Sequence, residues 1–155
     1  MQYEGRIFRP PSEADSLILQ STVGCSQNGC AFCSMYKEKK FHIRPLADVC
    51  ADVDEIAAGP WAHAFSRVFL ADGDALMRKT EEQLAIFSHI YARLPRCGRI
   101  TCYASPASIR AKTQDELEAL AAGGLNMVYM GLESGSDAVL SRMNKGATAA
   151  EIILA

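Results

Sequence analysis

The chain has 155 residues, of which 49% are apolar and 22% charged, and its 16 basic and 18 acidic side chains give a formal net charge of −2. This composition predicts one soluble globular domain rather than a disordered chain. The near balance of charge does not indicate nucleic-acid binding, although a local basic patch is compatible with it. No apolar run approaches the roughly 20 residues of a membrane-spanning helix, so no membrane partner is expected.

Residues 1–15 are polar and contain Pro10 and Pro11, so they read as an N-terminal extension rather than a signal peptide. A cytoplasmic location is therefore expected. Because thiols stay reduced there, the six cysteines of the chain indicate metal binding or buried thiols rather than disulfides.

Strand-like and helix-like stretches alternate along the chain. Apolar, strand-forming runs occupy residues 16–23, 67–71, 99–104 and 126–132. Stretches with helical periodicity separate or follow them, at residues 46–57, 80–94, 113–122 and 136–143. Strands joined by helices of this length predict an α/β fold with a parallel sheet, either half of a barrel or an open sheet.

Three pairs of residues have the spacing of a helix capping box. They are Thr80 with Gln83, Thr113 with Glu116, and Thr148 with Glu151. The third pair opens a helix that ends with the chain at Ala155, within two turns. We therefore expect the chain to be truncated at its C-terminus and to be part of a longer enzyme.

Candidate reactive residues follow each of the four predicted strands. The first strand leads into a cysteine loop, and the others into Asp72–Gly73–Asp74, Ser105–Pro106 and Glu133–Ser134–Gly135. In parallel α/β folds the loops at the carboxyl ends of the strands form the functional site. The sequence therefore predicts one site at this rim.

The cysteine loop carries the most specific pattern. Cys25, Cys30 and Cys33 lie within nine residues, and nearby glycines permit the turns that a loop around a metal centre needs. Three thiolates leave a metal position open, as a catalytic centre requires. On the cysteines alone, a structural zinc site with His42 or Cys50 as fourth ligand is an equal alternative.

This loop, with the aromatic Phe32 directly before its last cysteine, resembles the signature of the radical S-adenosylmethionine (SAM) superfamily. The resemblance includes GLESG at 131–135 and MNKG at 143–146 and covers the chain from Leu17 onward. It is similar to the branch with oxygen-independent coproporphyrinogen oxidases, tRNA methylthiotransferases and the elongator catalytic subunit, and most similar to uncharacterised members of that branch. The spacing here is C-x4-C-x2-C, whereas C-x3-C-x2-C is the commonest.

The resemblance implies a core domain over residues 16–155 that forms the first four βα units of a partial (βα)6, TIM-like barrel. It implies a [4Fe–4S] cluster on Cys25, Cys30 and Cys33, with one iron free to bind SAM. Reductive cleavage of SAM then gives a 5′-deoxyadenosyl radical that abstracts hydrogen from a substrate. The chain is accordingly expected to be a radical SAM enzyme or the N-terminal part of one.

Contacts to SAM are also implied by the resemblance. Asp72, Gly73 and Asp74 are expected to present acceptors to the SAM amino group, and Glu133 to bind the amino group or the ribose. Lys145 is expected to meet the SAM carboxylate. Phe32 is expected to pack near the adenine, and Ser105 and Ser134 to line the pocket.

The substrate and its product are not predictable from these residues. The mechanism implies a reductant such as flavodoxin or ferredoxin, whereas no residue here specifies one. The alternative function is a non-catalytic fragment that binds an iron–sulfur cluster or zinc. Turnover of SAM separates the two.

Overall fold

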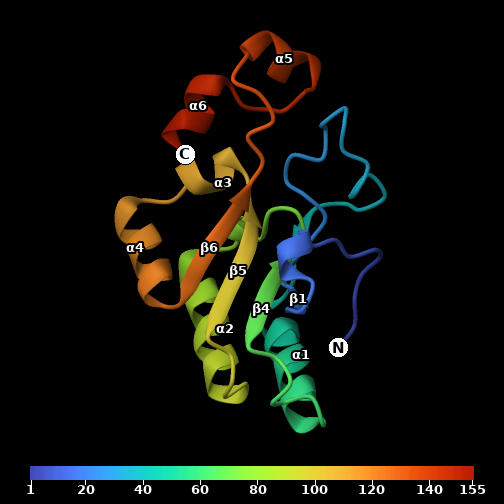
Figure 1. Ribbon diagram of the computed structural model, residues 1–155, viewed down its shortest axis with the longest axis vertical. Helices are drawn as coiled ribbons and strands as arrows, with labels where there is room; N and C mark the ends of the chain where they lie inside the picture. Colours follow the sequence, from blue (N-terminus) through green and yellow to red (C-terminus); the bar gives the residue numbers. More distant parts are fainter.

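The computed structural model describes residues 1–155 and contains a parallel four-stranded sheet (Figure 1). Its strand order is β1 (Leu17–Gln20), β4 (Arg67–Ala71), β5 (Arg99–Ala104) and β6 (Leu125–Met130). All three pairings are parallel, so the four carboxyl ends lie at the same edge of the sheet. The predicted α/β class and parallel sheet are confirmed.

Helices connect the strands and then continue past the carboxyl end of β6. The longer helices are α1 (Leu46–Ala58), α2 (Thr80–Arg93) and α4 (Gln114–Ala122), and the shorter ones are α3 (Pro106–Arg110), α5 (Asp137–Arg142) and α6 (Ala149–Leu154). Figure 1 shows α5 and α6 beyond the end of the sheet toward which the strand arrows point. None of these helices has the length and apolar character needed to cross a membrane.

The two faces of the sheet carry different side chains because neighbouring residues of a strand point in opposite directions. Leu19, Leu70 and Ile100 lie on one face in the main hydrophobic cluster, which also contains Val53 of α1 and Phe87 of α2. The opposite face is aromatic, with Phe69, Tyr103 and Tyr129 from β4, β5 and β6 in mutual edge-to-face contact. The sheet thus has helices on one face and an aromatic surface on the other.

Several predicted boundaries are wrong. Residues 16–23 form two strands, β1 and β2 (Thr22–Val23), because β2 leaves the sheet to pair antiparallel with β3 (His42–Ile43). The fourth strand ends at Met130 rather than at residue 132. Residues 106–110 after β5 form α3, capped by Ser105, where only a strand end was predicted.

Two of the three predicted capping boxes are confirmed, those of Thr113 with Glu116 and Thr148 with Glu151. The box of Thr80 with Gln83 is wrong. Thr80 is already inside α2 and donates to Glu116, while the Gln83 amide donates to the backbone oxygens of Leu76 and Arg78. Both side chains therefore bond to partners outside the helix end that the local pattern predicted them to cap.

The N-terminal residues run along the sheet and are tied to it by a buried carboxylate. Glu13, in the 3-10 helix Pro11–Glu13, is fully buried and accepts from Tyr129 Oη at 2.6 Å and Arg99 Nη2 at 3.1 Å. Hydrogen bonds from Ser16 and Tyr129, with the charge of Arg99, outweigh the large effect of burial and lower the Glu13 pKa. The expected division into residues 1–15 and 16–155 stays a prediction.

The core predicts a specific stability contrast. Phe87 is completely buried between the sheet and the helices, so Phe87→Ala should lower the free energy of unfolding by about 3–5 kcal/mol. Ile153 is 81% exposed, so Ile153→Ala should change it by less than about 0.5 kcal/mol. Denaturant unfolding followed by circular dichroism measures both, and equal losses would contradict this description of the core.

Candidate functional site

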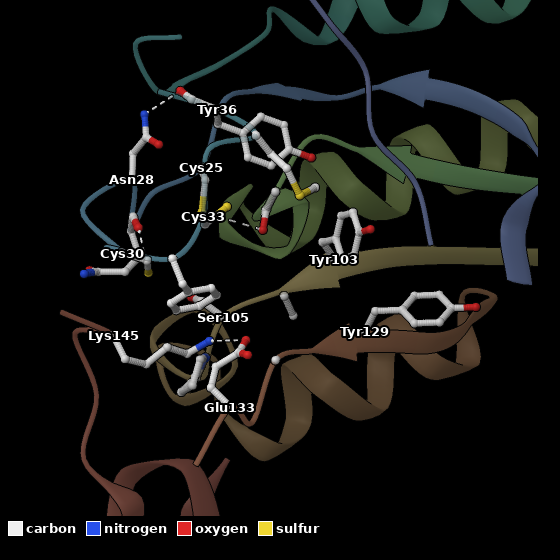
Figure 2. A pocket seen from close by; sticks show the side chains of 17 residues that line it. Cys25, Asn28, Cys30, Cys33, Tyr36, Tyr103, Ser105, Tyr129, Glu133 and Lys145 are labelled. Carbon is white, nitrogen blue, oxygen red and sulfur yellow. Dashed lines mark hydrogen bonds and ion pairs between the residues drawn. The ribbon is translucent and has the colours of Figure 1, made fainter. Parts of the chain in front are cut away.

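A cavity lies at the carboxyl ends of the strands, where the sequence predicts the site (Figure 2). Its volume is about 250 Å³, and it is open to solvent on one side. All four strand–helix loops contribute to its wall. The residues that line it are Cys25, Gln27, Asn28, Cys30, Phe32, Cys33, Met35, Tyr36, Gly73, Tyr103, Ala104, Ser105, Pro106, Tyr129, Gly131, Glu133 and Lys145.

The three cysteines of the loop all face this cavity. The Cys25 thiol lies 3.9 Å from the backbone oxygen of Gly73, and the Cys30 thiol lies 3.4 Å from that of Gln27. Burial, with nearby Asp74 and the other two thiols, raises the pKa of Cys25 to about 11. All three cysteines line the same cavity.

Amide side chains hold the cysteine loop in place. Asn28 Nδ2 donates to the backbone oxygens of Tyr36 and Lys39, at 2.6 and 3.1 Å, which closes the loop on itself. Asn144 Nδ2 donates to Gly29 O at 2.9 Å, and Ala31 N donates to Met143 O at 2.8 Å. The second pair of bonds brings the segment after α5 against the cysteine loop, although more than 100 positions separate them in the sequence.

Gly73 is the point at which the loop after β4 touches the cysteine loop. A Cβ atom at this position would lie 2.6 Å from a ring carbon of Tyr36 and 2.9 Å from Cys25 Cβ. Only glycine allows this approach, and the backbone of Gly73 thereby forms part of the cavity wall.

The structure does not bring the carboxylates of Asp72 and Asp74 into the cavity. Both residues are completely buried, and neither lines it. Asp72 accepts from Lys39 Nζ at 2.7 Å, and Asp74 accepts from Ser105 N at 3.0 Å, beside bonds to further donors. Protein donors occupy Asp72 Oδ2 and both oxygens of Asp74, whereas Asp72 Oδ1 is buried without a partner. Of the three expected acceptors, only the Gly73 backbone therefore lines the cavity.

Glu133, Lys145 and Phe32 come together on one wall. Lys145 Nζ lies 3.1 Å from Glu133 Oε1 and 6.0 Å from the centre of the Phe32 ring. Glu133 has a φ of 61°, a left-handed conformation that is uncommon outside glycine and asparagine. Its carboxylate folds back over Gly131, where a Cβ would lie 2.1 Å from Oε1. Gly131 therefore leaves the space that the Glu133 side chain occupies.

The two serines differ. Ser105 lines the cavity and caps α3, and its hydroxyl donates to Asp74 Oδ2 at 2.8 Å. Ser134 does not line the cavity, and its hydroxyl accepts from the backbone N–H of Ser136 at 3.1 Å. The structure therefore brings Ser105 to the site but leaves Ser134 outside it.

Sequence reasoning missed the aromatic wall of the cavity. Tyr36, Tyr103 and Tyr129 line it, and Tyr36 is only 3% exposed. Tyr103 and Tyr129 lie on strands whose alternation places them opposite the core residues, which is a signal that the sequence carried. Tyr36 lies in the cysteine loop, where no periodicity reveals its direction.

The structure contains no preformed ligand set for the alternative of a single structural zinc ion. No three His, Cys, Asp or Glu side chains converge closely enough to hold one metal ion. His42 is exposed, with Nδ1 against Lys40 O, and Cys50 lies on α1, so neither lines the cavity as a fourth ligand. An iron–sulfur cluster binds each cysteine through a different iron, so its ligands surround a volume rather than a point.

Comparison with known proteins decides the family. The model of the radical SAM superfamily matches residues 19–155, which is most of the chain. The chain belongs to the radical SAM superfamily. None of the curated proteins gives a significant sequence match to it.

Solved structures agree with the fold. The chain superposes on the cobalamin-dependent SAM radical enzyme OxsB, in a structure with aqua-cobalamin and SAM bound, with a TM-score of 0.68. The sequence identity is 21%, and the match covers 90% of this chain and 21% of the OxsB chain. The OxsB structure with aqua-cobalamin alone gives the same score over 89% of this chain. The FeFe-hydrogenase maturase HydG from Carboxydothermus hydrogenoformans matches at 0.49 and 19% identity, over 83% of this chain and 28% of that one.

This radical SAM chain therefore has the α/β fold of the superfamily's (βα) barrel core, with four of its parallel strands. It spans about a fifth of the length of OxsB, since it covers 21% of that chain. The superfamily uses a [4Fe–4S] cluster and SAM. Three thiols around one open cavity, beside the backbone of Gly73, are a donor set that fits such a cluster.

The close approach at Gly73 gives a prediction. In Gly73→Ala the new methyl group must displace Tyr36 and Cys25, so the variant should bind markedly less iron per chain after anaerobic reconstitution. Gly98→Ala is the matched control, because nothing lies within 4 Å of its Cβ position. Iron and sulfide analysis measures both, and full loading of Gly73→Ala would contradict the contact.

Proposed function

We propose that this chain binds a [4Fe–4S] cluster through Cys25, Cys30 and Cys33, binds SAM beside it, and takes part in radical SAM catalysis on a substrate not yet identified. The observation that carries this proposal is the convergence of three thiols on a single cavity at the carboxyl ends of four parallel strands. When bound, the cluster and SAM supply the one-electron chemistry of the superfamily.

The protein's own residues position these groups. The backbone of Gly73 offers an acceptor to the SAM amino group, and the Glu133 carboxylate, which lines the same cavity, offers another. Lys145 supplies a cation for the SAM carboxylate, and the exposed Phe32 ring offers a face on which the adenine can stack. Lys145 and Glu133 pair with each other at 3.1 Å, so each would exchange this partner for a part of SAM.

Asp72 and Asp74 have a positioning role in this proposal. Their buried carboxylates hold the loops on either side of Gly73 and do not touch SAM. Ser105 borders the cavity and orients Asp74 by donating a hydrogen bond to its carboxylate, while Ser134 stabilises the turn before α5 by accepting one from Ser136 N. A reductant such as flavodoxin or ferredoxin would deliver the electron, and no nucleic-acid partner is proposed.

SAM turnover tests the function. The reconstituted chain is incubated anaerobically with SAM and dithionite, and 5′-deoxyadenosine and methionine are measured by chromatography. Formation of both supports an enzyme. A chain that loads iron yet forms neither product is a non-catalytic iron–sulfur fragment, and zinc uptake in place of iron contradicts the proposal altogether.

Cys30→Ala should abolish the cluster while leaving the helices intact, because the side chain lies in a loop outside the main hydrophobic cluster. Iron content and far-ultraviolet circular dichroism measure the two effects. Cys50→Ala is the matched control, since Cys50 lies on α1 away from the cavity, and it should load as much iron as the unaltered chain. A cluster retained in Cys30→Ala would remove Cys30 from the ligand set.

Glu133→Gln should weaken SAM binding without loss of iron, because it removes a charged acceptor and keeps the shape of the side chain. A charge-assisted hydrogen bond is worth about 1.5–3 kcal/mol, so the Kd for SAM should rise roughly 10-fold or more. Glu118→Gln on the exposed side of α4 serves as control. Equilibrium binding to the reconstituted protein gives the Kd, and an unchanged value would exclude Glu133 from the SAM site.

A further inference from the structure

Residues 143–146, directly after α5, contact both the cysteine loop and the cavity. Met143 and Asn144 bond to the cysteine loop, whereas Lys145 lines the cavity. Figure 2 shows the Lys145 side chain reaching toward Glu133. Neighbouring residues of this segment thus contact two different parts of the site.

The end of α5 explains the backbone of Asn144 but not its side chain. Lys145 N donates to Leu140 O and Asn144 N donates to Ser141 O, both at 3.0 Å, which is the pattern of a Schellman motif. Asn144 has a φ of 50°, the left-handed conformation that such a motif requires at this position. Glycine is the usual residue there, so the helix end alone does not call for an amide side chain.

The amide of Asn144 holds one of the two peptide groups beside Cys30. Nδ2 donates to Gly29 O at 2.9 Å, which is the carbonyl of the peptide group before Cys30. Ala31 N, in the peptide group after Cys30, donates to Met143 O at 2.8 Å. Two consecutive residues therefore fix the backbone on both sides of Cys30.

Glycines on both segments allow this close approach. A Cβ atom at Gly29 would lie 2.8 Å from Asn144 Nδ2, so a side chain there would displace the amide. A Cβ atom at Gly146, whose φ is 74°, would meet the Gln27 side chain. Gln27 itself donates through Nε2 to Asn144 O at 3.3 Å. The contact is thus built from both segments and does not depend on one bond alone.

Lys145 follows Asn144 directly and extends into the site. Its side chain is 11% exposed, and its Nζ lies 3.1 Å from Glu133 Oε1 and 6.0 Å from the centre of the Phe32 ring. Because the two residues are adjacent, the bond from Asn144 to Gly29 also sets where the Lys145 side chain begins relative to the cysteine loop.

We propose that Asn144 is a positioning residue, which holds Lys145 at a fixed place relative to Cys30 through its bond to Gly29. This inference rests on the proposed function, in which Cys30 binds the cluster and Lys145 binds the SAM carboxylate. A SAM molecule that contacts the cluster and Lys145 at once needs both at the correct separation. A segment held there in advance need not be ordered during binding, which favours affinity. Asn144 does not line the cavity and acts only through its neighbours.

Asn144→Gly tests this role, because glycine removes the amide and keeps the left-handed backbone at the end of α5. The Kd for SAM and the iron content are measured after anaerobic reconstitution in Asn144→Gly, in Lys145→Met and in the variant with both changes. Gln114→Ala is the control, since the Gln114 amide bonds Glu118 within α4, outside the cavity.

We expect Asn144→Gly to load as much iron as the unaltered chain and to raise the Kd for SAM about two- to tenfold, the value of one hydrogen bond. In the Lys145→Met background the same change should not raise the Kd further, because the amide acts through Lys145. A role confined to the stability of the fold would instead give effects that add.

An unchanged Kd in either single variant, loss of iron in Asn144→Gly, or additive effects in the double variant would overturn the inference and leave the proposed function standing. An unaltered chain that loads iron but does not bind SAM would overturn the proposed function, and this inference with it. The two failures are therefore distinguishable.

Discussion

Two buried carboxylates at the end of β4 hold the site together. Asp72 accepts from Gln20 Nε2 of β1, from the backbone N–H of Gly24 at the start of the cysteine loop, and from Lys39 Nζ. Asp74 accepts from the Ser105 backbone and hydroxyl beyond β5, and from Ser108. Buried carboxylates are stable only when donors surround them, so the loops must converge to supply these donors.

Gly73 lies between the two carboxylates, which hold its backbone in position on both sides. Its neighbours are anchored on opposite sides, and its own backbone is pressed against Cys25 and Tyr36. The cysteine loop therefore rests on β4 rather than extending freely into solvent. The segment after α5 closes the arrangement through the bond from Asn144 to Gly29. The cavity, which is open to solvent on one side, lies between these loops.

The sequence was informative where a residue's role follows from strand position or local spacing. The parallel sheet and its site-bearing edge could be predicted, because apolar strands alternate with helices and polar loops follow each strand. Two capping boxes were confirmed because both partners lie in one turn. Thr80 and Gln83 have the same spacing, but contacts with Glu116 and with the turn before α2 determine their actual partners.

The parts of the site that could not be predicted depend on contacts between distant segments. Asp72 and Asp74 are residue types that often bind ligands, and only the fold shows that both are buried, with donors from the protein on Asp72 Oδ2 and on Asp74. The unpartnered hydroxyl of Tyr36 likewise depends on Phe8 and Gly73, which lie on other segments of the chain. Spacing singled out the three cysteines because they lie in one short loop, and the structure places all three on the cavity, while their role as ligands stays a prediction.

We propose that Cys25, Cys30 and Cys33 hold a cluster with one iron open to SAM. Electron paramagnetic resonance of the anaerobically reconstituted and reduced protein, recorded with and without SAM and accompanied by iron analysis, tests it most directly. About four irons per chain and a reduced-cluster signal that changes when SAM is added are the predicted result. Zinc without iron uptake would show that the thiols hold no such cluster, and a cluster signal that SAM does not alter would show that no iron is open to SAM.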